Sequence, residues 1–216
     1  MTADLKLTEG VLETDDGHAF PELGIWVSSN DPNKKALLVE YGFASEMHCL
    51  RLRSRSRAAR LKSGLFPAIA QSVIHNALGL GRTLAGLVTL TITGLVLNIS
   101  SFVAISAATA LFFLSVLVHE AGHVAALRYV APTETGVLVS RGWTFHLVRP
   151  TLNYRQEIAV ITTGPLAPLI ATIIFIPALI ISPPIFYFWL ALGLGHALLL
   201  LAPIGDGANL RNLRNP

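Results

Sequence analysis

Charged residues are scarce in this 216-residue chain, because Asp, Glu, Lys and Arg together make up 13% of it. Soluble domains have about 25%. With 52% hydrophobic residues, this composition excludes an ordinary water-soluble globule. The single cysteine, Cys49, excludes an internal disulfide and a zinc site built from cysteines. The first 60 residues also lack an apolar run of the signal-peptide kind, so we expect no N-terminal cleavage.

Two long segments lack charged residues altogether. Residues 83–118 contain no Asp, Glu, Lys, Arg or His, and residues 158–205 contain only His196 of these types. A run of about 18 such residues already indicates a transmembrane helix. As a single helix the first segment would be about 54 Å long, well beyond the hydrocarbon core of about 30 Å. The sequence therefore predicts a multi-pass integral membrane protein.

Each of these segments is expected to fold into a hairpin of two spans. Asn98, Ser100 and Ser101 interrupt the first segment, and the pair Pro183 and Pro184 interrupts the second. The fold class we predict is an all-α membrane protein with a four-transmembrane-helix core, a small cytoplasmic N-terminal region of mixed or irregular structure, and a short β-hairpin-like loop. The predicted spans are residues 81–99, 102–130, 158–181 and 185–205.

Basic residues occur on one side of these hairpins only. They precede the first span, lie between the second and third, and follow the fourth, whereas the two short turns have none. The positive-inside tendency then places both termini in the cytoplasm, with the plasma membrane as the expected location. Residues 51–62 hold five Arg and one Lys without an acid, which suits contact with anionic lipid head groups. Nucleic acid is the less favoured partner, since this run adjoins a span and lacks aromatic residues.

The chain divides into four predicted parts. Within the N-terminal part, residues 24–27 and 36–39 suit short strands, and residues 137–148 in the long loop predict a β-hairpin. Residues 1–62 are a cytoplasmic region with its basic juxtamembrane segment, and residues 63–80 are an interfacial helix. Residues 81–210 are the intramembrane core, and residues 211–216 are a cytoplasmic tail.

Carboxylates are rare after residue 62, where only four occur. Glu134 and Glu157 belong to the cytoplasmic loop or its edge and are expected to be solvated. Glu120 and Asp206 lie inside or at the ends of predicted spans. An ionisable group at such a depth costs at least about 2.5 kcal/mol and is by default a functional candidate with a partner.

Glu120 stands in the segment HEAGH, residues 119–123. Residues i and i+4 share one face of a helix, so His119 and His123 can bind one zinc ion while Glu120 holds a water. A catalytic zinc needs a third protein ligand, which Asp206 can supply because it lies at a similar depth near the inner end of the fourth span. The alternatives are a pair of hydrogen-bonded core histidines and a solvated helix-end aspartate. His196 lies in mid-span, where a structural hydrogen bond is favoured over a catalytic role.

These residues together resemble the site-2 protease family of intramembrane zinc metalloproteases. The resemblance covers about residues 81–210 and rests on HEAGH, on the Gly164-Pro165 step and on Asp206-Gly207 at the end of the fourth span. It implies a zinc metalloendopeptidase with one Zn²⁺ per chain, which cuts transmembrane or membrane-associated proteins. In the implied site, Glu120 activates the water, and the metal ligands are His119, His123 and Asp206.

The chain departs from the family pattern at two positions, because Pro168 and Ala202 stand where family members often have asparagine. Two other classes stay open. A non-proteolytic membrane protein, such as a transporter subunit or an immunity factor, could use the same fold to bind a metal or a peptide. A di-iron membrane oxygenase would need many more histidines than the seven present.

Overall fold

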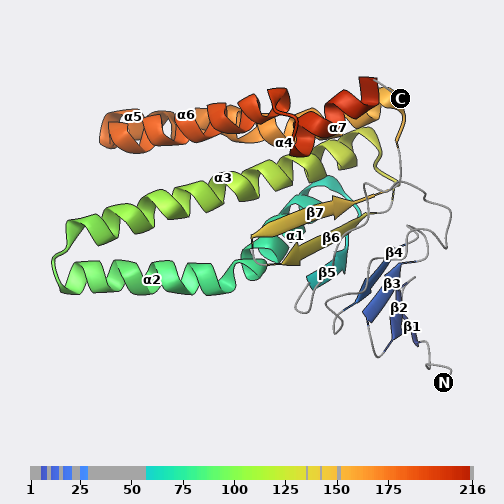
Figure 1. Cartoon of the computed structure of the whole chain (residues 1–216), viewed down its shortest axis with the longest axis horizontal. Helices are drawn as coiled ribbons and strands as arrows, with labels where there is room; N and C mark the ends of the chain where they lie inside the picture. The colour runs from blue at the N-terminus through green and yellow to red at the C-terminus, as the bar shows by residue number, and fades with distance from the viewer. Residues whose placement is uncertain are drawn as a thin grey trace. The chain divides into compact units, whose positions relative to one another are not determined.

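The computed structural model describes residues 6–8, 11–14, 17–20, 25–28, 57–134, 136–141, 143–149 and 152–214. These residues are mostly helical, and the chain forms two compact units (Figure 1). The smaller unit combines Met1–Lys62 with Thr133–Thr151, and the larger one combines Ser63–Pro132 with Leu152–Pro216.

The smaller unit contains two antiparallel sheets. In the first sheet, neighbouring strands follow one another in the chain: β1 (Lys6–Thr8), β2 (Val11–Thr14), β3 (Gly17–Phe20) and β4 (Ile25–Ser28). Strand β4 overlaps the strand predicted at residues 24–27, whereas the one predicted at residues 36–39 lies outside the described residues. The second sheet has the order β5 (Arg57–Arg60), β6 (Val137–Arg141), β7 (Thr144–Val148).

The β-hairpin predicted in the long loop is confirmed, because β6 pairs with β7 from Val137 opposite Val148 to Arg141 opposite Thr144. Strand β5 was not predicted. It occupies the end of the basic run, and its Ala58 pairs with Val139 of β6. The sequence of β5, RAAR, has neither β-branched residues nor the alternation that predicts a strand, and its pairing depends on a segment distant in the chain.

Nine helical elements of the described residues make up the larger unit. They are α1 (Leu65–Gly79), α2 (Gly81–Val96), α3 (Ser100–Val130), α4 (Tyr154–Ile170), the 3-10 helix η4 (Ala171–Phe175), α5 (Ile176–Ile181), α6 (Pro183–Leu198), the 3-10 helix η5 (Leu199–Leu201) and α7 (Gly205–Arg214). Elements α4 to α5 run on without a gap, as the third predicted span requires.

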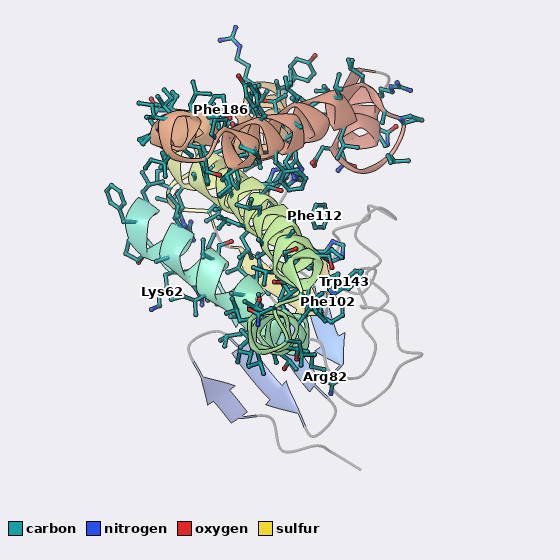
Figure 2. All side chains as sticks on the ribbon, turned by 90° about the vertical axis from the view of Figure 1, so that its left-hand side faces the viewer. Lys62, Arg82, Phe102, Phe112, Trp143 and Phe186 are labelled. Carbon is teal, nitrogen blue, oxygen red and sulfur yellow. The ribbon has the colours of Figure 1, made fainter. Side chains whose placement is uncertain are left out.

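Three helical stretches in the described chain are long and apolar enough to cross a membrane. They are Ser100–Val130, Tyr154–Ile181 and Pro183–Leu213. The first predicted span is not confirmed as a crossing helix, because α2 has 16 residues, about 24 Å of helix, and is bent by 69° from α1. Only α1 and α2 together, as one broken span, would make a fourth. Large apolar side chains such as Phe112 point outward from the helices, as lipid contact requires (Figure 2).

The two short turns lie at the same end of the larger unit (Figure 1). The α2–α3 turn passes through Asn98, which has a positive φ of 54°, and the α5–α6 break falls at Ser182, just before Pro183. The C-terminal part of α3, the start of α4 and α7 therefore meet at the opposite end.

Helix α4 is the centre of the larger unit, since it packs against both α3 and α6. The indole of Trp189 on α6 is fully buried, and its Nε1–H donates a 3.1 Å hydrogen bond to the Pro168 carbonyl. Gly193 of α6 lies against the Leu169 backbone, because a Cβ added to Gly193 would be 2.9 Å from the Leu169 Cα. The two helix backbones thus approach each other without an intervening side chain.

We expect Gly193→Ala to lower the free energy of unfolding by about 1–3 kcal/mol, the usual cost of overpacking, because the Leu169 backbone cannot move aside. Gly195→Ala is the matched control, since no atom lies within 4 Å of its new Cβ. Both changes gain similar helix propensity. Thermal unfolding in detergent measures the difference, and equal stability of the two variants would contradict the close packing.

Candidate metal centre

The helix α3 carries His119 and His123 one turn apart on one face. Its sequence is rich in Ala, Leu and Phe and contains neither Pro nor Asp, so a continuous 31-residue helix forms and ends at Ala131, before Pro132. The two imidazoles lie in the C-terminal half of this helix. Their ring centroids are 4.9 Å apart with an interplanar angle of 79°.

Asp206 reaches the site from a break in the last helical stretch. After η5 the backbone is extended at Ala202, and Gly205, with a φ of +52°, starts α7. Glycine takes up such a φ readily because it has no Cβ. Gly207 packs so closely on the carbonyls of Leu199 and Ala202 that no side chain fits there. The fourth predicted span, residues 185–205, therefore does not end as one straight helix, and Asp206 lies in the first turn of a new one.

Three ligand atoms converge at this point. The Asp206 Oδ2 atom lies 3.1 Å from His119 Nε2 and 3.4 Å from His123 Nε2, and the two Nε2 atoms are 3.2 Å apart. The three side chains are 10, 12 and 19% exposed for His119, His123 and Asp206, respectively. The group could hold a metal ion, because each residue offers one ligand atom to a common centre.

The orientation of His123 is set by a backbone carbonyl of the neighbouring helix. Its Nδ1 lies 2.7 Å from the Val160 oxygen of α4, and since a carbonyl can only accept, Nδ1 carries the proton and donates it. The lone pair of neutral His123 is then on Nε2, directed at the Asp206 oxygen. Two lone pairs at 3.4 Å repel each other, so a cation between them is the natural complement. Metal-binding histidines typically donate the N–H of their other ring nitrogen to such an acceptor.

Close contact between α3 and α4 places His123 against this carbonyl. A Cβ on Gly164 would overlap the His123 imidazole, and one on Gly122 would lie 2.7 Å from the Ala167 Cβ and 2.8 Å from the Thr163 oxygen. Both positions therefore exclude every side chain. The Gly164-Pro165 step of the sequence thus has a structural role that the spacing of the ligands does not reveal.

Glu120 lies between the two histidines in the chain and is partly exposed. Its carboxylate interacts electrostatically with His119, His123 and Asp206, so it stands beside the group without being one of its three ligands. A carboxylate in this position can accept a proton from a water next to a bound cation.

One prediction about a neighbouring residue is wrong. Glu157 is buried at the start of α4, and its Oε1 accepts a 2.8 Å hydrogen bond from the Leu152 N–H, because the free amides there need acceptors. One contact of the site was not predicted from the sequence: the ring centroid of His196 on α6 lies 4.9 Å from that of His119. The only feature of the sequence that pointed to His196 was its position as the one ionisable residue in an apolar segment.

Comparisons of the chain with protein-family models, with curated proteins and with solved structures found no match. What the site can do therefore follows from its geometry alone.

Gly164→Ala is expected to abolish metal binding although every ligand is still present, since the new methyl group displaces the His123 imidazole. Gly86→Ala serves as the control, because its Cβ meets no atom within 4 Å. Elemental analysis of protein purified in detergent measures the metal content. Full metal content in the Gly164 variant would contradict the packing.

Asp206→Ala removes one of three ligands, and we expect its metal affinity to fall by more than the roughly 10–100-fold caused by the loss of a group that hydrogen-bonds to a ligand. Titration against a competing chelator gives the affinity. Glu134→Ala, which removes a carboxylate of the smaller unit, should bind the metal as the wild type does. An unchanged affinity in Asp206→Ala would exclude this residue as a ligand.

Proposed function

We propose that the protein is an intramembrane zinc metalloprotease of the kind its sequence resembles, the site-2 protease family. The observation that carries the proposal is the group of His119, His123 and Asp206 within ligand distance of one another, with Glu120 beside it. Two imidazoles and a carboxylate with a neighbouring glutamate are the parts that a zinc hydrolase needs.

The donor set and its spacing favour zinc among the divalent cations. Tetrahedral zinc with bonds of about 2.0–2.1 Å needs ligand atoms about 3.4 Å apart. The three distances of 3.1, 3.2 and 3.4 Å come close to this value. Calcium and magnesium prefer sites made of oxygen atoms alone, so two imidazoles argue against them. Three protein ligands also leave the fourth tetrahedral position for water.

In the proposed reaction, a bound zinc would polarise the scissile carbonyl and lower the pKa of the attacking water toward neutrality. Glu120 would accept the proton of this water and pass it to the leaving amine of the cut peptide bond. Val160 would keep His123 in the tautomer that presents Nε2, through the 2.7 Å hydrogen bond from Nδ1.

The proposed topology has four spans, with α1 and α2 as one broken span at the start. Both termini and the loop between α3 and α4 would face the cytoplasm, because the basic residues cluster there. His123 precedes the end of α3 by seven residues, which puts the site about 10 Å from the cytoplasmic end of that helix. The substrate would then be a transmembrane or membrane-associated protein whose helix unwinds near this depth.

The test of the proposal is Glu120→Gln, expressed in cells that lack the natural copy and compared with the wild type. The variant should keep one zinc per chain and lose about 10²–10⁴-fold in the rate of cleavage, the usual contribution of a general base. Membrane proteomes would show uncut proteins that accumulate in the variant and shortened ones in the wild type.

Glu134→Gln is the control, because it removes a carboxylate of the smaller unit and should leave the proteome as in the wild type. Identical membrane proteomes for Glu120→Gln and the wild type would overturn proteolysis. That result, with zinc still bound, would instead favour a metal- or peptide-binding membrane protein.

A further inference from the structure

One nitrogen of the candidate metal centre has no hydrogen-bond partner among the residues that the structure describes. His119 directs Nε2 at Asp206 and His123, so in a metal-bound state the lone pair is on Nε2 and the proton is on Nδ1. This Nδ1 is buried and makes no hydrogen bond. Metal-binding histidines almost always donate their second N–H to an acceptor, as His123 does to Val160.

The imidazole of His196 lies next to the His119 ring. Its ring centroid is 4.9 Å from that of His119, with 42° between the ring planes. The Nδ1 atom of His196 is also buried without a hydrogen bond. Two neighbouring side chains thus each have one unsatisfied nitrogen, although buried polar groups in proteins are nearly always paired.

The tautomer of His196 follows from its other neighbour, Ser115. The Ser115 hydroxyl lies 2.7 Å from the Phe112 carbonyl, to which it can only donate its single proton. The contact of 3.1 Å between Ser115 Oγ and His196 Nε2 must then be a bond that Nε2–H donates. Neutral His196 therefore has its lone pair on Nδ1.

The two unpaired nitrogens are consequently complementary, because His119 Nδ1 is a donor and His196 Nδ1 is an acceptor. We propose that His196 is the positioning residue of the metal centre: its Nδ1 accepts the Nδ1–H of His119, and Ser115 holds it in the required tautomer. The two nitrogens are not hydrogen-bonded in the structure, so the proposed bond requires rotation of one or both rings about the broad χ2 torsion.

This inference rests on the metal centre of the proposed function and not on proteolysis. It explains why an imidazole occurs in α6, where an ionisable side chain at membrane depth needs a partner. It also gives each of the two histidine ligands its own acceptor, a backbone carbonyl for His123 and a side chain for His119. Both rings of the HEAGH segment are then held in one orientation.

The experiment measures zinc affinity of the full chain in detergent by competition with a chelator. His196→Phe keeps a flat ring of similar size without an acceptor and should bind zinc about 10–100-fold more weakly. His196→Asn can place its Oδ1 near the position of Nδ1 and should recover most of that loss. His146→Phe, a change of an exposed histidine in the smaller unit, is the control and should bind zinc as the wild type does.

A second readout is the visible spectrum of the Co²⁺-substituted protein, which responds to ligand orientation. It should change in His196→Phe and return toward the wild-type spectrum in His196→Asn. Equal affinity and an equal spectrum in His196→Phe and the wild type would overturn the proposal. Equal losses in the Phe and Asn variants would overturn it too, because the acceptor would then have no part in the effect.

If a change at His196 prevents folding, Ser115→Ala tests the same proposal. Removal of one hydroxyl frees His196 to take the other tautomer, so zinc affinity should fall several-fold while the unfolding temperature of the metal-free protein stays near that of the wild type. Unchanged zinc affinity in this variant would contradict the proposal. A wild-type protein that binds no zinc would refute the metal centre itself, whereas absent cleavage with normal zinc binding would refute only the protease.

Discussion

The contact between α3 and α4 at Gly122 and Gly164 is the constraint on which the site depends. Lipid supplies no hydrophobic force that drives helices together, so helices in a bilayer associate through close packing of small residues. Here the two glycines bring the α4 backbone within hydrogen-bond reach of His123, and the Val160 carbonyl then selects the tautomer of that ring. Without this approach the HEAGH segment would be two histidines on a lipid-facing helix.

The third ligand arrives by a different physical route. Asp206 owes its place to the break between η5 and α7, where the positive φ of Gly205 and the tight packing of Gly207 turn the chain inward. A carboxylate among apolar helices is unfavourable by itself, and its two imidazole neighbours, with which it could hold a metal ion, compensate for its burial. The same reasoning applies to His196 and Ser115, whose polar side chains lie in apolar helices and contact each other.

Much of the helical unit could be predicted, because its signals are local. The absence of charge in residues 83–118 predicted the α2–α3 hairpin, and Ser182 with Pro183 predicted the α5–α6 break. The break between α1 and α2 falls where the sequence predicted the interfacial helix to end and the first span to begin, whereas no local pattern specifies the 69° bend. Strand β5 and the burial of Glu157 were missed for a related reason: each depends on a partner that lies elsewhere in the chain.

The sequence by itself determined the membrane character of this protein and the identity of the metal-ligand candidates, because apolar runs and i, i+4 histidine spacing are properties of a single helix. Only the tertiary structure decided that Asp206 meets both histidines, that Val160 orients one of them, and that His196 stands beside the other. The physical reason is that these contacts join separate helices. Their distances depend on how closely the helix backbones pack at Gly122 of α3, Gly164 of α4 and Gly193 of α6.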